Sequence, residues 1–372
     1  MSFLGGFLDT VFAAIGCCLP EANLSINGRA YRIVKMLGEG GFSFVYLAED
    51  GSGNLYALKK IRCTLGTEEA EVAKREVEVY KLFEHENIIR MLDTATIEES
   101  DGSTTIYILL PYYKRGNLQD AINRNHLDQK HFTENQMLTL FRGVCSAIQY
   151  MHTYKRPGGG RRQYPTKNPI TGGEDDVHRQ DTAPLLSGQT HQEQSSSIET
   201  HPPGKEDDII PWAHRDIKPG NIMVTDDGKS ILMDFGSACQ ARIEIHSRQE
   251  ALKQQDIAAE HCSMPYRAPE LFDVKTETVL DEKVDIWSLG CTLYAMAYGQ
   301  SPFEVSLNDQ GGSIALAVLN GQFKFPSDNR YSKEFQDLIS WMLQVDPKSR
   351  PDIQQISERV DSLLNREDAS SS

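Results

Sequence analysis

The residues of this 372-residue chain that are best suited to chemistry form one short run, His214-Arg215-Asp216-Ile217-Lys218-Pro219-Gly220-Asn221. The run places a carboxylate, an ammonium group and a carboxamide at fixed offsets within a single loop. Such a set suits phosphoryl transfer, in which positioning and charge stabilisation supply almost all of the catalysis. Asp216 could accept the proton of a substrate hydroxyl, Lys218 could neutralise the transferred phosphoryl group, and Asn221 could bind magnesium.

A second carboxylate follows in Asp234-Phe235-Gly236, at the short distance that a hairpin between the two motifs would give. Asp234 would be the other magnesium ligand of the same site. Two unrelated polar turns are a poor explanation for both motifs in this order and at this spacing. The two motifs therefore predict a site that uses ATP and Mg²⁺.

A glycine-rich segment, Gly38 to Val45, could hold the phosphates, because glycine lets the backbone N–H groups come close to phosphate oxygens. Ser43 stands where the third glycine of a GxGxxG pattern would be, and its hydroxyl could still face a phosphate. A plain turn is the alternative interpretation of such a cluster. The candidate nucleotide ligands of this segment are Gly38, Gly40, Gly41, Ser43 and Val45.

Lys59 lies on the third predicted strand, in Ala57-Leu58-Lys59, and Glu76 lies inside the helix predicted after it. A carboxylate in that helix could pair with Lys59 and hold its ammonium group against the α- and β-phosphates. Taken alone, each would more simply be a surface residue, as we expect for the neighbouring lysine and glutamates. We expect Lys59 and Glu76 to be catalytic together with Asp216 and Lys218.

The elements that must position these residues fall into two regions. Residues 31–61 alternate β-branched and aromatic residues between turns, which predicts an antiparallel meander. Residues 68–83 have a helical period, residues 104–111 return to a strand pattern, and helices dominate from residue 117 onward. The sequence therefore predicts an α+β fold with a strand-rich lobe at about 31–110, a helical lobe at about 117–362, and a cleft between them.

One segment interrupts this pattern. Residues 154–211 are polar, rich in proline, glycine and serine, and almost free of large apolar side chains. Such a segment cannot bury enough surface to offset the entropy of ordering, so we expect a disordered insertion.

Composition restricts the other partners. The net charge of −15 argues against nucleic acid as a partner. The seven cysteines form no CxxC pair, which is typical of a reducing compartment and predicts a cytoplasmic protein. No run approaches the ~20 apolar residues of a membrane span.

Three further motifs complete the pattern: Ala268-Pro269-Glu270, Asp285-Ile286-Trp287-Ser288-Leu289-Gly290, and Asp346-Pro347-Lys348-Ser349-Arg350-Pro351. In order and spacing, the whole set resembles the protein kinase signature over about residues 31–362, apart from the insertion. The resemblance implies a two-lobed kinase fold and transfer of the γ-phosphate of ATP to protein hydroxyls. It also implies that Glu270 pairs with Arg350 as a buried strut and that Asp285 braces the catalytic loop.

The same resemblance assigns the adenine site. Pro111 would lack an N–H but keep a carbonyl that accepts from adenine N6, and the N–H of Tyr113 would serve adenine N1. Leu110 would be the gatekeeper that precedes this hinge. By position, the residues around the ring would be Val45, Ala57, Leu110, Pro111, Tyr113 and Met223.

The segments GEGGFSFVYL, LLPYYKRGNLQDAI, DFGSACQA and VDIWSLGCTLYAM resemble one branch of the Numb-associated kinases, the myristoylated-and-palmitoylated serine/threonine kinases. The long insertion and the apolar N-terminus with paired cysteines are most similar to its fungal vacuole-membrane members. That branch carries a helix in the activation segment, and residues 247–261 have the helix formers for one. The alternative is a solvated loop that orders only on phosphorylation.

The N-terminal segment, residues 1–20, carries an apolar stripe at helical spacing and ends near Cys17 and Cys18. Cysteines beside an amphipathic helix suit reversible palmitoylation, so we expect a peripheral anchor on endomembranes of the vacuole or Golgi. Ser2 excludes N-myristoylation, which needs glycine at that position. A helix that docks on the kinase domain is the alternative.

Two other classes of protein fit the sequence less well. A membrane-tethered pseudokinase scaffold would normally have lost one of the residues Lys59, Asp216 or Asp234, and all three are present. A small-molecule kinase would not need the Ala-Pro-Glu segment, which builds a platform for peptides. Lys218 favours serine and threonine over tyrosine, although minor tyrosine autophosphorylation stays open. We therefore expect a serine/threonine kinase that acts on proteins in vesicle traffic or vacuole and Golgi membrane dynamics.

Overall fold

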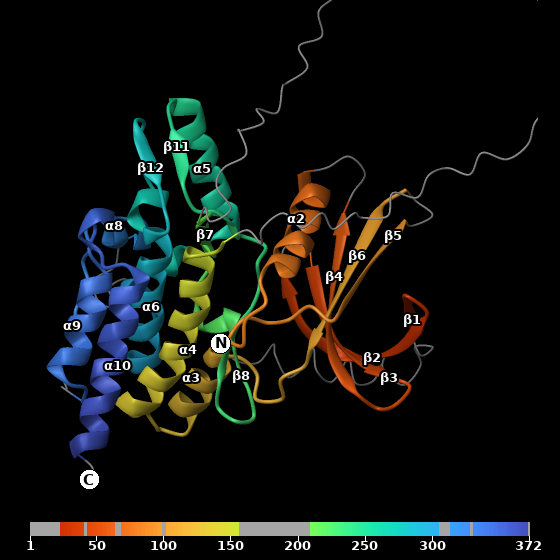
Figure 1. Cartoon of the computed structure of the whole chain (residues 1–372), viewed down its shortest axis with the longest axis horizontal. Coiled ribbons are helices and arrows are strands. Elements are labelled where there is room, and N and C mark those ends of the chain that lie inside the picture. The colour runs from red at the N-terminus through yellow and green to blue at the C-terminus, as the bar shows by residue number, and fades with distance from the viewer. Residues whose placement is uncertain are drawn as a thin grey trace, which may run out of the picture. The chain divides into compact units, whose positions relative to one another are not determined.

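The computed structural model describes residues 23–40, 43–63, 68–98, 102–155, 209–304, 313–327 and 330–370 (Figure 1). The predicted anchor at residues 1–20 and nearly all of the predicted insertion at about 154–211 lie outside these ranges. Contacts divide the chain into a larger unit, Met1–Tyr154 with Pro211–Ser372, and a smaller one, Lys155–Ile210. The helices and strands named below all belong to the larger unit.

An antiparallel six-stranded sheet forms the first part, in the order β1-β2-β3-β4-β6-β5. The predicted meander is confirmed, but it starts earlier than expected, because Asn27 and Gly28 form a tight turn between β1 and β2, both with positive φ. Helix α2 packs against β4 and β6. The elements are β1 (Asn23–Ile26), β2 (Arg29–Gly40), β3 (Ser43–Asp50), β4 (Leu55–Cys63), α2 (Glu68–Leu82), β5 (Asp93–Glu98) and β6 (Thr104–Pro111).

The two faces of this sheet bury different cores. On β4, Leu58 belongs to a small core with Tyr31 and Tyr107, whereas Ala57 and Ile61 belong to the main core. This division follows the pleat, which sends successive side chains to opposite faces. The small core consists of Ile26, Tyr31, Ala48, Leu58, Tyr107 and Leu109.

The side chain of Asn27 joins the two outermost strands of the sheet. Its Nδ2 donates to Asp93 Oδ1 at 2.7 Å and to the carbonyl of Thr94 at 3.1 Å, both on β5. The turn after β1 therefore reaches the opposite edge, and the sheet curls round the small core.

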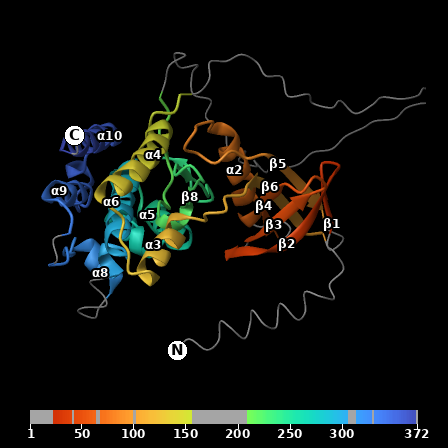
Figure 2. The ribbon, with the colours of Figure 1, turned by 90° about the horizontal axis from the view of Figure 1, so that it is seen from below.

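Helices form the second part, as predicted, and Figures 1 and 2 show them gathered beside the sheet within the larger unit. Helix α6 is buried along almost its whole length, which fits a sequence that is apolar on all sides. Gly290 of α6 has no room for a side chain, because an added Cβ would lie 2.9 Å from Leu343. The helices are α3 (Leu118–Leu127), α4 (Glu134–His152), α5 (Arg248–His261), α6 (Lys283–Tyr298), α8 (Ile314–Leu319), α9 (Lys333–Met342) and α10 (Ile353–Ser370).

Helix α5 confirms the helix predicted within residues 247–261. Ser247 caps it: its side chain accepts from the N–H of Glu250, whose carboxylate accepts in turn from the N–H of Ser247. Short strands surround the catalytic motifs: β7 (Trp212–Ala213), β8 (Ile222–Val224), β9 (Ser230–Leu232), β10 (Cys239–Gln240), β11 (Ile243–Ile245) and β12 (Thr278–Leu280).

Candidate active site

Lys59 of β4 lies between two carboxylates from different parts of the chain. Its Nζ is 2.6 Å from Glu76 Oε1 on α2 and 3.0 Å from Asp234 Oδ1, after β9. Burial alone would lower the pKa of Lys59, but the two carboxylates outweigh it and hold that pKa well above its usual value. The charge of Lys59 lowers the pKa of Asp234 to about 2. The predicted pairing of Lys59 with Glu76 is therefore confirmed, and both carboxylates share one ammonium group.

Asp216 is the centre of the hydrogen bonds in the catalytic loop. Its Oδ2 accepts from Lys218 Nζ at 2.7 Å and from Asn221 Nδ2 at 2.9 Å. The Asn221 amide nitrogen also donates to the carbonyl of Asp216 at 2.8 Å. The structure thus brings together the three residues of the run that the sequence singled out.

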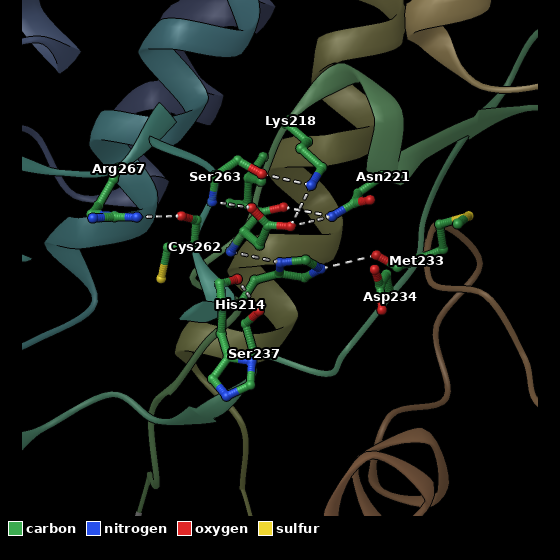
Figure 3. Close-up of polar contacts among 12 residues, drawn as sticks. His214, Lys218, Asn221, Met233, Asp234, Ser237, Cys262, Ser263 and Arg267 are labelled. Atoms are coloured by element: carbon green, nitrogen blue, oxygen red, sulfur yellow. Dashed lines mark hydrogen bonds and ion pairs between the residues drawn. The ribbon is translucent and has the colours of Figure 1, made fainter. Parts of the chain in front are cut away.

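Ser263 is a further member of the site that the sequence did not reveal. Its N–H donates to Asp216 Oδ1 at 2.8 Å, and its Oγ accepts from Lys218 Nζ at 2.6 Å (Figure 3). Ser263 follows α5 by two positions and is 47 residues from Asp216 along the chain. No local pattern marks it, because its contacts depend on how the whole activation segment folds back.

Asp285, at the start of α6, holds the catalytic loop by its backbone. It accepts from the N–H groups of His214 and Arg215, both at 2.8 Å, and contacts His152 Nε2 at 3.0 Å. Burial opposes the charge of Asp285, but these hydrogen bonds keep its pKa below the usual value. The brace expected of Asp285 is confirmed.

Two residues of the site have left-handed backbone conformations. Arg215 and Asp234 both have φ of 67°, which is uncommon for residues other than glycine. Such conformations persist where the surrounding contacts over-determine them. Here Asp285 fixes the backbone of Arg215, and Lys59 fixes the side chain of Asp234.

Phe235, next to Asp234, packs between the two parts of the larger unit. Its ring centroid is 5.1 Å from that of Tyr80 on α2 and 5.4 Å from that of His214.

The expected strut between Glu270 and Arg350 is also present. Arg350 Nη1 and Nη2 donate to the two carboxylate oxygens of Glu270, at 2.7 and 2.8 Å. These contacts support the site without touching its reacting groups.

The residues expected around adenine lie on adjoining strands. Ala57 pairs with Leu110 across β4 and β6, and Val45 of β3 pairs with Lys59. Leu110 is buried, directly before Pro111 at the end of β6. Tyr113 follows that strand, and Met223 lies on β8 in the helical part.

The described residues of the glycine-rich segment lie on β2 and β3, where Gly38 pairs with Val45 and Gly40 with Ser43. Gly41 lies outside the described residues. A cavity of about 1010 Å³ opens beside Ser43, bordered by Ser43, Lys59, Glu76 and Gly236 on one side and by α5 on the other. Val45, Ala57 and Leu110 do not border it.

The donor set for a divalent cation fits Mg²⁺ in type. Among the described residues, no cluster of three or more His, Cys, Asp or Glu side chains could form a metal cage. Mg²⁺ in such enzymes takes one or two protein oxygens and completes its shell with water and phosphates. Because the Asn221 nitrogen donates to Asp216, its amide oxygen is left for a cation, and Asp234 stays ionised.

A family model for the protein kinase domain matches residues 31–155 and 211–360. The chain therefore belongs to the protein kinase family, and it is a serine/threonine kinase that uses ATP and acts on proteins. Within the family it belongs to the branch of the serine/threonine-protein kinases ppk13, ENV7 and 16. This confirms the branch that the sequence motifs indicated.

The chain is 34% identical over 361 residues to serine/threonine-protein kinase ppk13 of Schizosaccharomyces pombe, covering 96% of this chain and 98% of the relative. It is 35% identical over 366 residues to serine/threonine-protein kinase ENV7 of Saccharomyces cerevisiae, covering 95% and 98%. It is 33% identical over 348 residues to serine/threonine-protein kinase 16 of Homo sapiens, covering 93% and 94%. None of the helices in the described ranges has the length and apolar character needed to cross a bilayer.

Proposed function

We propose that this kinase transfers the γ-phosphate of Mg-ATP to serine or threonine hydroxyls, with Asp216 as the base. The observation that carries the proposal is the set of contacts on Asp216, which accepts from Lys218, Asn221 and Ser263 at once. A carboxylate fixed on three sides presents one orientation to an incoming hydroxyl, and such positioning supplies most of this catalysis.

In the reaction, the substrate hydroxyl oxygen forms a bond to the γ-phosphorus while the bond from that phosphorus to the bridging oxygen of ADP breaks. The hydroxyl proton passes to Asp216. Lys218, whose Nζ is 2.7 Å from Asp216 Oδ2, would stabilise the charge of the transferring phosphoryl group. Lys59, held by its hydrogen bond to Glu76, would bind the α- and β-phosphates.

Asn221 and Asp234 would hold Mg²⁺, which neutralises charge on the phosphates when bound. Gly38, Gly40, Gly41 and Ser43 of the glycine-rich segment would bind those phosphates. Val45, Ala57, Leu110, Pro111, Tyr113 and Met223 would enclose adenine.

Replacement of Asp216 by Asn tests the proposal against a pseudokinase scaffold. Asn keeps the size and the accepting oxygen but cannot take the proton, so phosphorylation of a protein substrate such as casein should fall by about two to four orders of magnitude. Asp226→Asn is the matched control, because Asp226 is exposed on the turn between β8 and β9. Wild-type activity in Asp216→Asn would refute the assignment of the base.

We further propose that residues 1–20 anchor the kinase to endomembranes of the vacuole or Golgi, where it acts in vesicle traffic or membrane dynamics. The support is the apolar stripe of Phe3, Leu4, Phe7, Leu8, Val11, Phe12 and Ile15, followed by Cys17 and Cys18. One acyl chain binds only marginally, whereas an acyl chain with an inserted apolar helix holds stably.

Fractionation of cells tests the anchor. Wild type should sediment with membranes, and the double variant Cys17→Ser/Cys18→Ser should be mainly in the supernatant with kinase activity retained. Detection of thioester-linked lipid on wild type alone supports acylation. A double variant that sediments as wild type does, without detectable lipid on either protein, would refute it.

A further inference from the structure

The position of α5 is linked to the proposed base. The chain leaves α5 at His261 and reaches Ser263 two residues later, where the Ser263 N–H bonds Asp216 and its hydroxyl bonds Lys218. Ser237 Oγ donates to the carbonyl of His261 at 2.7 Å and ties the same end of the helix to the segment after Asp234. A shift of α5 would therefore move a direct partner of Asp216.

Arg215, next to Asp216, has an incomplete set of partners. The residue is only 4% exposed. Its Nη1 donates to Gln254 Oε1 on α5 at 3.1 Å, whereas its Nε and Nη2 have no hydrogen-bond partner within the described ranges. A buried charge is costly unless it is paired and hydrogen-bonded. Gln254 is therefore the acceptor on which this guanidinium depends.

The contact is specific to one position of the helix. Among the described residues, no other side chain of α5 forms a hydrogen bond to the catalytic loop. The next residue, Gln255, donates instead to the carbonyl of Phe272 at 3.1 Å, beyond the Ala-Pro-Glu motif. The middle of α5 thus meets the catalytic loop at Gln254 and the rest of the activation segment at Gln255.

We infer that Gln254 is a positioning residue for phosphoryl transfer. It holds α5 against the catalytic loop through Arg215 and so keeps Ser263 on Asp216 and Lys218. The inference rests on the proposed role of Asp216 as the base. The side chain of Gln254 is a neutral amide that lies 38 positions after Asp216 in the chain.

Two substitutions at position 254 separate the acceptor from the bulk of the side chain. Gln254→Leu keeps size and helix propensity but removes the acceptor, so kcat should fall about tenfold. The KM for ATP should change less than about twofold, because that term reflects ground-state binding, which the lost contact does not touch.

Gln254→Glu has the same length and supplies a carboxylate that can accept from two guanidinium N–H groups. We therefore expect kcat at or above that of wild type and a higher melting temperature. The control is Gln354→Leu, since Gln354 is an exposed glutamine of α10 that bonds Glu358. That variant should keep the wild-type kcat.

Hydrogen exchange supplies a readout independent of activity, since loss of the contact should speed exchange of the α5 amides in Gln254→Leu and not in Gln254→Glu. Loss of kcat in the Leu variant with rescue by Glu supports the inference. A wild-type kcat in Gln254→Leu overturns it, and so does equal impairment of the Leu and Glu variants. An active Asp216→Asn would instead refute the base assignment, so the two failures are distinguishable.

Discussion

The catalytic loop is held differently on its two sides. On the side of α6, Asp285 is completely buried, and both of its carboxylate oxygens accept hydrogen bonds from the loop backbone or from His152. On the side of α5, the attachment consists of the Arg215–Gln254 bond and the contacts of Ser263. The first is charge-assisted and complete, and the second leaves two guanidinium nitrogens without a partner in the described chain. We therefore expect the α6 attachment to contribute mainly to stability and the α5 attachment mainly to activity.

The largest expected effect is that of Asp285→Ala. It leaves two buried N–H groups and His152 without their acceptor, so the free energy of unfolding should fall by about 3–5 kcal/mol. Urea denaturation followed by fluorescence measures this. Asp361→Asn is the control, because Asp361 forms an exposed ion pair with Arg142 at 3.8 Å. A loss as small as that of the control would mean that the α6 attachment is not the stronger one.

An intermediate effect is expected on the α5 side. Ser263→Ala removes the hydroxyl that Lys218 contacts and keeps the N–H that reaches Asp216. The kcat should fall about fivefold to tenfold while stability changes by about 1 kcal/mol or less. Ser263→Thr retains the hydroxyl and should retain activity. If Ser263→Ala destabilised the fold as strongly as Asp285→Ala, the distinction between the two sides would be lost.

A smaller effect is expected on the pH dependence of stability, through Asp234. The pKa of Asp234 is about 2 in the folded chain against an ordinary value of 3.8, so the unfolded chain binds the proton first. Its stabilising contribution is full above about pH 4 and is lost as pH falls towards 2. The stability difference between wild type and Asp234→Asn should therefore shrink as pH is lowered from about 5 to 2.5 in denaturation experiments. A difference independent of pH would contradict the pairing with Lys59.

The smallest effect is expected at Asn27, whose side chain forms hydrogen bonds away from the catalytic loop. Asn27→Gly removes the bonds to β5 and keeps a residue that tolerates positive φ. The free energy of unfolding should fall by about 1 kcal/mol or less, with unchanged kcat. A loss of activity in Asn27→Gly would show that kcat responds to any weakened contact. The effect of Gln254→Leu could then not be attributed to its contact with Arg215.

Much of the site could be predicted because its residues are close in sequence or lie on regular elements. Asp216, Lys218 and Asn221 share one loop, and Lys59 and Glu76 were placed by strand and helix periodicity. The resemblance to the kinase branch and the helix formers of residues 247–261 also placed α5 closely.

The rest depends on tertiary placement. Ser263 and Gln254 meet the catalytic loop across 47 and 39 residues, and neither stands in a pattern that implies a partner. Strand β1 was missed, since a four-residue strand carries little periodicity, although Asn27-Gly28 was a turn signal. The hydrogen bonds from Asn27 to β5 could not be predicted, because such a prediction requires the order of the strands in the sheet.

The curled sheet lets its edge strand β1 open locally while the rest of the domain stays folded. The small core around Tyr31 and Tyr107 is separate from the main core, which continues from the other face of the sheet into the helices. Strand β1 can therefore detach and re-form without exposing the side chains around Lys59. Amide exchange at Leu24 and Ile26 should then reflect a low-energy local opening, whereas the amides of Leu58 and Ile108 exchange only when the whole domain unfolds.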